Sequence, residues 1–489
     1  MNTFLEGLKK ENNKTVTENG ATQYKSTLNK VLDLFALGGS YRNRSEEDCI
    51  TLFKEAFEED KLLAVKCLFY LRDCRGGASE RRFFRVCFKW LADEYPDTAI
   101  KIFKYIPEYG RYDDLYCMID TPLQNDFLDF LKTLIALDLQ CDAPSLAAKW
   151  MPSENASSAK TKELAKITRN YFGMTSKEYR KTLSKLRKKI KVLEGLMSQN
   201  KWDEIDFGKI PSKAGMKYKT AFSTREETKD RYIEFIESKE TKVNASVLCP
   251  HDIAREALIR TYGKKDPQRA ILQKYWDNLP SYYNGREETG IAVVDVSGSM
   301  EGIPMDAAIS LGAYIAERGK GLFANHFITF SENPDIVEFK GDDIVDKMQC
   351  CKRANWGFNT NIEAVFDLLL DIAKMNDVKE EDIPERVYIF SDMEFDRAVN
   401  EDYDSFEPID KVALFDRIKN KWYEEGYRVP DLVFWNLDAR SNQIPCIGEG
   451  ISYVSGFSPA MIECVLGGKT GWDLCLEKLN SERYASITI

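Results

Sequence analysis

The first half of the chain repeats apolar residues at the three- and four-residue spacing of amphipathic helices. Leu28, Val31, Leu32 and Phe35 form one such stripe, which ends at Gly38-Gly39. Similar stripes predict helices over residues 46–58, 61–71, 79–94, 97–105, 126–137, 160–172, 224–238 and 251–262. Short connections and the lack of convincing strand patterns favour helices packed as antiparallel neighbours, in a solenoid without a fixed repeat period. The polar residues 1–23 are expected to be flexible.

The most regular stripe lies between residues 177 and 197. Its apolar positions step by three and four along one face: Leu183, Leu186, Ile190, Leu193 and Met197. This spacing predicts one continuous helix that docks by a single stripe and presents cations on its other faces. Farther along, residues 211–214 are expected to be extended or to form a turn.

Near residue 285 the pattern changes to short apolar runs that alternate with helical stripes. Strands are expected over 291–295, 322–330, 336–339, 387–392, 431–436 and 451–454, and helices over 305–317, 360–374, 411–422 and 459–466. This alternation predicts a doubly wound parallel α/β sheet, with 336–339 as a hairpin partner of the strand before it. The predicted fold class is α plus α/β in several parts: a flexible segment 1–23, a helical domain 24–285 and an α/β domain 286–489.

An oxygen-rich motif follows the first strand of the predicted α/β domain. Asp295, Ser297 and Ser299 lie two residues apart, and in open α/β sheets ligands bind outside the carboxyl ends of strands. Thr360 lies near a predicted helix start, and Asp392 ends a second apolar strand. Carboxylate and hydroxyl oxygens suit Mg²⁺ or Mn²⁺ better than zinc or copper, so these five residues are expected to share one metal site. The alternative is a Ser/Gly turn whose aspartate caps a helix.

These three motifs, in this order, resemble the von Willebrand factor A fold and its metal-ion-dependent adhesion site. The resemblance implies that Ser297, Ser299 and Thr360 contact the metal, and that Asp295 and Asp392 act mostly through water. The chain departs from the family at the third loop, where the usual Asp-Gly is replaced by Asp392 followed by a methionine.

The net charge of the chain is −10, which by itself argues against nucleic acid, but the cations are segregated. Residues 149–222 hold about 18 lysines and arginines against about 7 acidic residues, an asymmetry that indicates a local binding face. The residues expected to bind phosphate there are Arg180, Lys181, Lys185, Arg187, Lys188 and Lys191. A solvated charged face is the alternative. Charge reversal at Lys185, Arg187 and Lys188 is expected to leave the fold intact, because these positions lie off the apolar stripe.

A second group of cations surrounds Gly76-Gly77 near a helix start. Its members are Arg72, Arg75, Arg81 and Arg82. Guanidinium groups and backbone donors at such a turn suit phosphate. The same arginines suit ion pairs with Asp73, Glu80 or Asp113 between helices equally well, and the sequence leaves both readings open.

Blocks spread over most of the chain resemble the Ro/TROVE architecture, and most closely a TROVE-related family of unknown function. They are residues 70–82, 107–115, 149–154, 177–187 and 391–396. The resemblance implies a ring of HEAT-like helices, touched at both ends by a von Willebrand A domain, in a protein that binds structured or misfolded non-coding RNA. The expected function is an RNA-binding component of a Ro-like ribonucleoprotein, whose metal site binds a carboxylate of a protein partner or closes the ring.

An adaptor that uses the metal site and the basic helices to bind protein, without RNA, is the alternative function. A hydrolase is disfavoured, so no enzyme is expected: Glu394 and Asp396 add carboxylates near Asp392, but neither has an assignable role. The 12 scattered cysteines indicate a reducing, cytoplasmic location. The sequence contains no apolar run of about 18 residues, so no membrane contact is expected.

Overall fold

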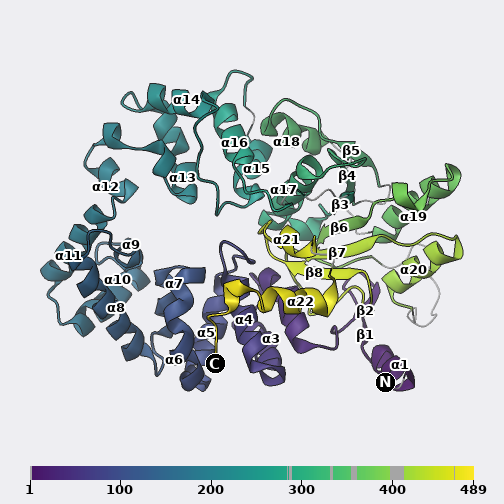
Figure 1. The fold of residues 1–489 in the computed structure, drawn as a ribbon, viewed down its shortest axis with the longest axis horizontal. Coiled ribbons are helices and arrows are strands. Elements are labelled where there is room, and N and C mark those ends of the chain that lie inside the picture. The colour runs from purple at the N-terminus through teal and green to yellow at the C-terminus, as the bar shows by residue number, and fades with distance from the viewer. Residues whose placement is uncertain are drawn as a thin grey trace.

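The computed structural model describes residues 3–260, 262–283, 285, 289–330, 334–353, 361–396, 412–466 and 469–489. Helices make up the first part of the chain, and a mixed six-stranded sheet flanked by helices makes up the second (Figure 1). The helices of the first part are α1 (Thr3–Asn12), α2 (Lys30–Leu37), α3 (Glu46–Glu59), α4 (Lys61–Arg72), α5 (Arg82–Glu94), α6 (Pro96–Ile102), α7 (Ile106–Tyr109), α8 (Gln124–Gln140), α9 (Ala147–Trp150), α10 (Ala159–Phe172), α11 (Ser176–Lys189), α12 (Leu193–Ser198), α13 (Ser212–Thr224), α14 (Lys229–Glu237), α15 (Pro250–Ile259) and α16 (Pro267–Asp277).

Local capping explains why several helices begin where the apolar stripes predicted them. Ser45 caps α3 in a capping box with Asp48, and the Asp60 side chain accepts a hydrogen bond from the Leu63 amide at the start of α4. Both α3 and α4 then bury their apolar faces, Leu68 and its neighbours on α4 being fully enclosed.

The sheet has the strand order β5-β4-β3-β6-β7-β8. Its strands are β3 (Gly290–Val294), β4 (His326–Thr329), β5 (Ile336–Glu338), β6 (Arg386–Ser391), β7 (Asp431–Asn436) and β8 (Ile451–Ser455). All neighbours are parallel except β4 and β5, which pair antiparallel, so the predicted parallel sheet and its hairpin edge are confirmed. The helices of this α/β domain are α17 (Ile303–Arg318), α18 (Ile344–Arg353), α19 (Ile362–Met375), α20 (Leu414–Glu424), α21 (Met461–Val465) and α22 (Gly471–Leu479).

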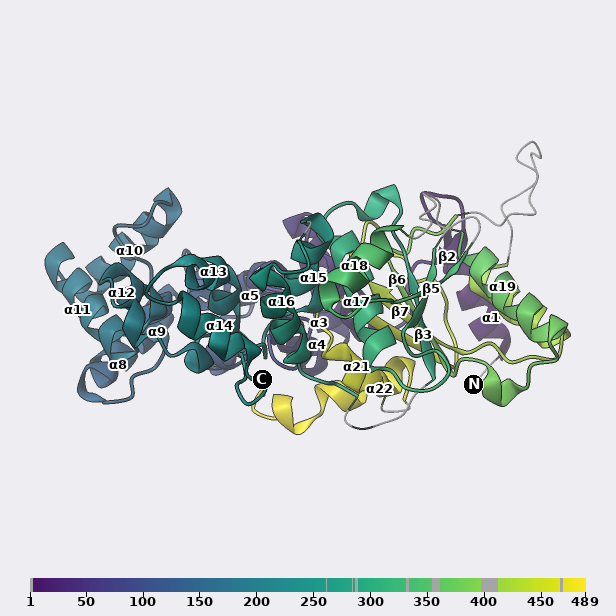
Figure 2. The same ribbon diagram turned by 90° about the horizontal axis from the view of Figure 1, so that it is seen from above.

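The first part of the chain follows a curved path that leaves the α/β domain and returns to it. In Figures 1 and 2 the helices run from α3–α5 out to α8–α12 and back through α13–α16. At one end α2 packs on β8 and α22, and at the other end α15 packs on α17 and α18. The expected contact of the α/β domain with both ends of the helical array is therefore confirmed.

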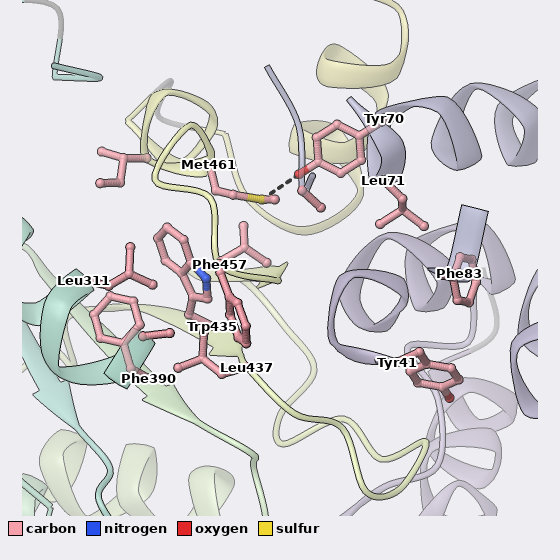
Figure 3. Close-up of a cluster of buried hydrophobic side chains, with 14 of the residues drawn as sticks. Tyr41, Tyr70, Leu71, Phe83, Leu311, Phe390, Trp435, Leu437, Phe457 and Met461 are labelled. Carbon is pink, nitrogen blue, oxygen red and sulfur yellow. Dashed lines mark hydrogen bonds between the residues drawn. The ribbon is translucent and has the colours of Figure 1, made fainter. Parts of the chain in front are cut away.

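One apolar core continues across the junction between α4 and the α/β domain. Figure 3 shows Tyr70 of α4 facing Met461 of α21, and the Tyr70 hydroxyl lies 2.8 Å from the Met461 sulfur. Nearby, the Gly39 amide donates to the Ser455 hydroxyl at 2.9 Å. A Cβ at Gly39 would lie 2.3 Å from the Ser455 carbonyl oxygen, so only glycine permits this close approach.

Three expectations about local structure are wrong. The first residues are not loose throughout: α1 is followed by a hairpin of β1 (Lys14–Val16) and β2 (Thr22–Tyr24), whose buried polar groups find partners in the α/β domain. The segment at 211–214 is not extended, because α13 begins at Ser212. The helix expected over 177–197 is two helices, since the chain leaves α11 after Lys189 and Lys191 takes a φ of 54°.

The N-terminal hairpin is anchored on the α/β domain, and the C-terminal residues are anchored on the helical region. Tyr24 of β2 pairs through its backbone with Ile444 in the α/β domain. At the C-terminus, the Arg483 guanidinium forms an ion pair with the buried Asp73 at the end of α4.

None of the helices in the described ranges is long and apolar enough to cross a membrane.

Candidate metal site and basic surface

The oxygen-rich motif lies where two adjacent parallel strands end. Asp295 follows β3, and its amide donates to the Phe390 carbonyl of β6 at 3.0 Å. Ser391 is the last residue of β6, and its hydroxyl donates to Asp295 Oδ2 at 2.6 Å. Parallel pairing of β3 with β6 therefore brings Asp295 and Asp392 to the same edge of the sheet.

Hydrogen bonds within the first loop fix its two serines beside Asp295. The Ser297 amide donates to Asp295 Oδ1 at 2.9 Å, and the Ser297 and Ser299 hydroxyl oxygens lie 2.9 Å apart. Four of the five expected metal-site residues thus gather at one edge of the sheet. Thr360, the fifth, lies outside the described residues.

Asp392 has an oxygen with an unmet hydrogen-bonding capacity. Its side chain is fully buried, and its Oδ1 accepts from the Glu394 amide at 3.2 Å. Its Oδ2 has no hydrogen-bond partner among the described residues, although Arg440 Nε lies 3.4 Å away. A buried carboxylate oxygen that is held only by this ion pair of 3.4 Å, without a hydrogen bond, could also be satisfied by a bound cation.

Burial sets the electrostatics of both carboxyl groups. It raises the pKa of Asp295 to about 7, and the Asp392 carboxylate adds to the rise. Burial also raises the pKa of Asp392, against the opposing effect of the Ser299 hydroxyl. Two desolvated carboxylates side by side therefore resist ionisation, and a divalent cation would remove that resistance.

The loop after β6 adopts a glycine-like conformation without a glycine. Met393 has a φ of 68° and is buried. The Met393 amide donates to the Ser391 hydroxyl at 3.0 Å, and the Met393 carbonyl accepts from Gln23 Nε2 at 2.9 Å. These two bonds, with burial of the side chain, hold a backbone conformation that disfavours residues with a Cβ.

The hairpin of β1 and β2 covers this edge of the sheet through Glu394. The Glu394 carboxylate accepts from the Glu18 amide at 3.0 Å and from the Ser441 hydroxyl at 2.7 Å, and its carbonyl accepts from Asn19 Nδ2 at 2.7 Å. Glu394, a carboxylate without an assignable role in the sequence, therefore anchors the N-terminal hairpin.

No group of three or more His, Cys, Asp or Glu side chains within the described ranges has the geometry of a metal centre. The candidate site instead combines two carboxylates with hydroxyl oxygens. That donor set fits a hard cation which keeps part of its water shell, as Mg²⁺ does. It does not fit zinc or copper, which prefer nitrogen and sulfur ligands.

The basic surface lies on α10 and α11, far from this edge of the sheet (Figure 1). Arg180, Lys181, Lys185, Lys188 and Lys191 are exposed, as expected. Of these five, only Arg180 forms an ion pair within the described chain, a long one of 3.8 Å to Glu154. Lys160, Lys162 and Lys166 on α10, the helix that precedes α11 in the chain, are exposed as well.

The inclusion of Arg187 in this surface is wrong. Its guanidinium donates to the carbonyls of Ala148 and Met151, both at 2.9 Å, and to the Ser153 hydroxyl at 2.8 Å. All of its side-chain nitrogens are used to hold α9 and the residues that follow it against α11. Charge reversal at Arg187 would leave these acceptors unpaired, so this reversal is now expected to cost stability.

The second group of arginines divides between the fold and the surface. Arg72 is buried and forms an ion pair of 2.7 Å with Asp114, and Arg82 donates to the Arg44 carbonyl at 2.8 Å. Arg72 stabilises the helical region and is not accessible to phosphate, so its assignment to an RNA surface is wrong. Arg82 is half-buried, and its contact with RNA stays a prediction. Arg75 and Arg81 are exposed, and Arg81 lies 4.0 Å from Asp113.

Sequence comparisons place the chain beside proteins of undetermined function. Residues 17–108 and 143–281 match a domain of unknown function (DUF2828), and residues 289–483 match a second domain of unknown function (DUF7788). The uncharacterized protein L728 of Acanthamoeba polyphaga mimivirus is 31% identical over 505 residues, which cover 94% of this chain and 85% of the viral protein. The chain belongs to the same family as this viral protein. In this chain the two matched domains meet between residues 281 and 289, just before β3.

Two residues at the edge of the sheet, Glu18 and Arg440, were not among the sequence candidates. Arg440 follows β7, the strand next to β6, so the rule that places Asp295 and Asp392 at strand ends also applies to it. The position of Arg440 shortly after an apolar run could therefore have been recognised in the sequence. Glu18 carried no such signal, because its position depends on a hairpin far away in the chain.

Proposed function

We propose that this protein is an RNA-binding component of a ribonucleoprotein, which holds phosphate groups on α10 and α11 and carries a divalent-metal site in its α/β domain. The proposal includes a HEAT-like helical array and a von Willebrand A-like domain, as in the Ro/TROVE architecture. The return of the helices to the α/β domain and the placement of the Asp-x-Ser-x-Ser loop at the sheet edge both support this reading.

The observation that carries the RNA proposal is the set of exposed lysines on two consecutive helices, α10 and α11. A solvated charged helix usually mixes signs, whereas here the exposed lysines of α10 and α11 have no acidic partner in the described structure. Closely spaced cations of this kind suit a phosphate backbone, because binding releases the counterions of the nucleic acid. Arg187 joins α11 to α9 and to the residues that follow α9, and so helps to keep α11 in place.

The metal proposal rests on Asp392 Oδ2 together with the pairing of Asp295 and Asp392 at one sheet edge. Ser297, Ser299 and Thr360 would supply hydroxyl ligands, Thr360 remaining a prediction. When bound, Mg²⁺ or Mn²⁺ would supply an open coordination position for a carboxylate.

A filter-binding titration with a structured RNA at two salt concentrations tests the RNA proposal. The variant carries Lys181→Glu, Lys185→Glu and Lys188→Glu, which avoids Arg187. We expect at least about tenfold weaker binding at low salt and a smaller salt dependence, because about three phosphate contacts are lost. The control carries Lys54→Glu, Lys340→Glu and Lys379→Glu, three exposed lysines outside residues 149–222 that already pair with acids. Equal affinities for the two variants would contradict the proposal.

A protein-interaction adaptor is the second candidate, favoured by the distance between the two sites. The sheet that carries the metal site and α11 lie in opposite halves of the molecule in both views (Figures 1 and 2), so the two sites can bind different partners independently. An adaptor would bind no RNA at low salt in the titration above, and the α11 variant would then match wild type.

A further inference from the structure

The turn of the N-terminal hairpin packs against the loop that follows Asp392 of the candidate metal site. We refer to residues 17–23 as the cap. The Thr17 hydroxyl donates to the Phe395 carbonyl at 2.8 Å, Gly20 forms a backbone bridge with Asp396, and Gln23 holds the Met393 carbonyl. The cap therefore follows the whole loop after β6, from the residue beside Asp392 to Asp396.

A single arginine links the cap to the site. Arg440 Nε lies 3.4 Å from Asp392 Oδ2, and its Nη1 lies 3.7 Å from the Glu18 carboxylate. Its Nη2 donates to the Ser299 carbonyl at 3.1 Å. The guanidinium thus stands between a buried carboxylate of the site and an exposed carboxylate of the cap, whose side chain is 66% exposed.

We propose that Glu18 is the chain's own carboxylate for the metal site, so that the cap occupies the face which a partner's carboxylate would need. The inference rests on the proposed metal site and adds the residue that regulates access to it.

Charge explains why a cation would strengthen the hold of the cap. Without a metal, Asp392 and Glu18 share one cationic side chain, Arg440. A dication beside Asp295 and Asp392 balances those two carboxylates and repels the guanidinium. Glu18 is then attracted by both the displaced Arg440 and the cation, directly or through a metal-bound water.

The same arrangement identifies the kind of partner that would use the site. A protein with an exposed Asp or Glu can reach the metal only by displacing Glu18. Such a partner exchanges one carboxylate for another, and it must also release Thr17 and Gln23 from their backbone acceptors. The cap therefore selects for partners that contribute more than a single carboxylate.

Manganese binding and hydrogen exchange test the inference together. Mn²⁺ alone is titrated against the full-length protein by electron paramagnetic resonance, and backbone exchange of residues 14–24 is measured with and without Mn²⁺. Wild type should bind Mn²⁺ and gain protection at residues 17–21. Glu18→Gln should bind Mn²⁺ about three- to tenfold more weakly and gain none, since charge count tunes affinity at such sites. Arg440→Gln should bind Mn²⁺ more tightly, because its competitor is gone.

Matched variants test the role of Glu18 separately from the existence of the metal site. Glu11→Gln removes the same charge from the exposed pair of Glu11 with Lys14, outside the cap, and should behave as wild type. Asp295→Asn should abolish binding. One outcome would overturn the role of Glu18 alone. In that outcome wild type binds Mn²⁺, Asp295→Asn does not, and Glu18→Gln equals wild type in both Mn²⁺ affinity and hydrogen exchange. Glu18 would then not be a ligand, although the metal site would be supported. If wild type and Asp295→Asn both fail to bind, the metal site and the inference fall together.

Discussion

At the scale of single residues, Asp114 shows how an arginine-rich segment becomes part of a protein core. Its carboxylate is fully buried and accepts from Arg72 Nε at 2.9 Å, Arg85 Nε at 2.7 Å and the Arg111 amide at 2.9 Å. Burial alone would raise the pKa of Asp114, but Arg72 and Arg85 lower it below its ordinary value. The arginines here hold helices together by neutralising one buried charge.

Replacing Arg72 should therefore affect stability far more than replacing its exposed neighbour Arg81. Arg72→Met leaves Asp114 buried with fewer partners, and breaking such a pair costs about 3–5 kcal/mol. Arg81→Met removes only a weak exposed contact, worth about 0–1 kcal/mol. Thermal melts of the two variants at pH 7 provide the comparison. A similar melting temperature for both would mean that Arg85 and the Arg111 amide are sufficient for Asp114.

The sequence allowed Asp295, Ser297, Ser299 and Asp392 to be placed together because strand ends are local features. Each follows an apolar run, and parallel neighbours bring their ends to one edge. The roles of Arg72, Arg82 and Arg187 were not predictable in this way. An arginine in a sequence is compatible with phosphate or with a buried acceptor, and only the fold shows which acceptors lie within its reach.

At the scale of elements, the break between α11 and α12 shows the limit of periodicity. Ile190 and Leu193 continue the apolar stripe of Leu186, so the pattern shows no interruption. The structure nevertheless ends α11 with a Schellman-type turn, in which the Val192 amide donates to the Arg187 carbonyl at 3.3 Å. Lys191 supplies the left-handed residue that usually is a glycine.

Lys191→Gly should stabilise the protein. Glycine takes a φ of 54° without the cost imposed by a Cβ, and such a change is worth about 0.5–1 kcal/mol. Lys188→Gly, inside α11, should destabilise by a similar amount because glycine disfavours helix interiors. Denaturant midpoints of the two variants should move in opposite directions. Destabilisation by both would indicate that Lys191 contributes packing which outweighs backbone strain.

Helix α13 was not predicted because local sequence signals disfavour a helix there. Pro211 and an internal glycine, Gly215, both disfavour a helix in the sequence. In the structure Pro211 precedes the first turn, and a Cβ at Gly215 would lie 2.1 Å from the Tyr275 hydroxyl oxygen. The close contact of α13 with Tyr275 of α16 thus requires glycine at position 215, although glycine has a low helix propensity. Strand β7, by contrast, has the predicted bounds, since a strand buried on both faces reads as an unbroken apolar run.

At the scale of the whole molecule, the two ends of the helical array meet on one aromatic ring. Phe457, just after β8, has the Arg42 guanidinium 3.7 Å from its ring centre, and the His251 imidazole of α15 lies edge-on at 5.1 Å. Arg42 follows α2, near the start of the array, whereas α15 lies near its end. Closure of the array was expected from family resemblance, because no spacing in the sequence links residues this far apart.

This junction should make stability depend on the protonation of His251. Burial lowers the pKa of His251 to about 4, and its Nδ1 has no hydrogen-bond partner among the described residues. Between about pH 6.5 and pH 4 the unfolded chain binds a proton at His251 that the folded chain does not, so acidification favours unfolding. At pH 5 the loss relative to pH 8 should be about 2 kcal/mol.

Thermal melts of wild type and His251→Phe between pH 5 and pH 8 measure this contribution. The comparison must be between variants, because the raised pKa of Asp295 gives the opposite slope: its folded form gains a proton as the pH falls towards 5. Relative to wild type, His251→Phe should lose less stability on acidification, since a ring remains against Phe457 but cannot become charged. His326→Gln removes the only other histidine and should follow wild type. Parallel pH profiles for wild type and His251→Phe would mean that the imidazole becomes protonated in the folded protein, and that the junction opens to water without unfolding.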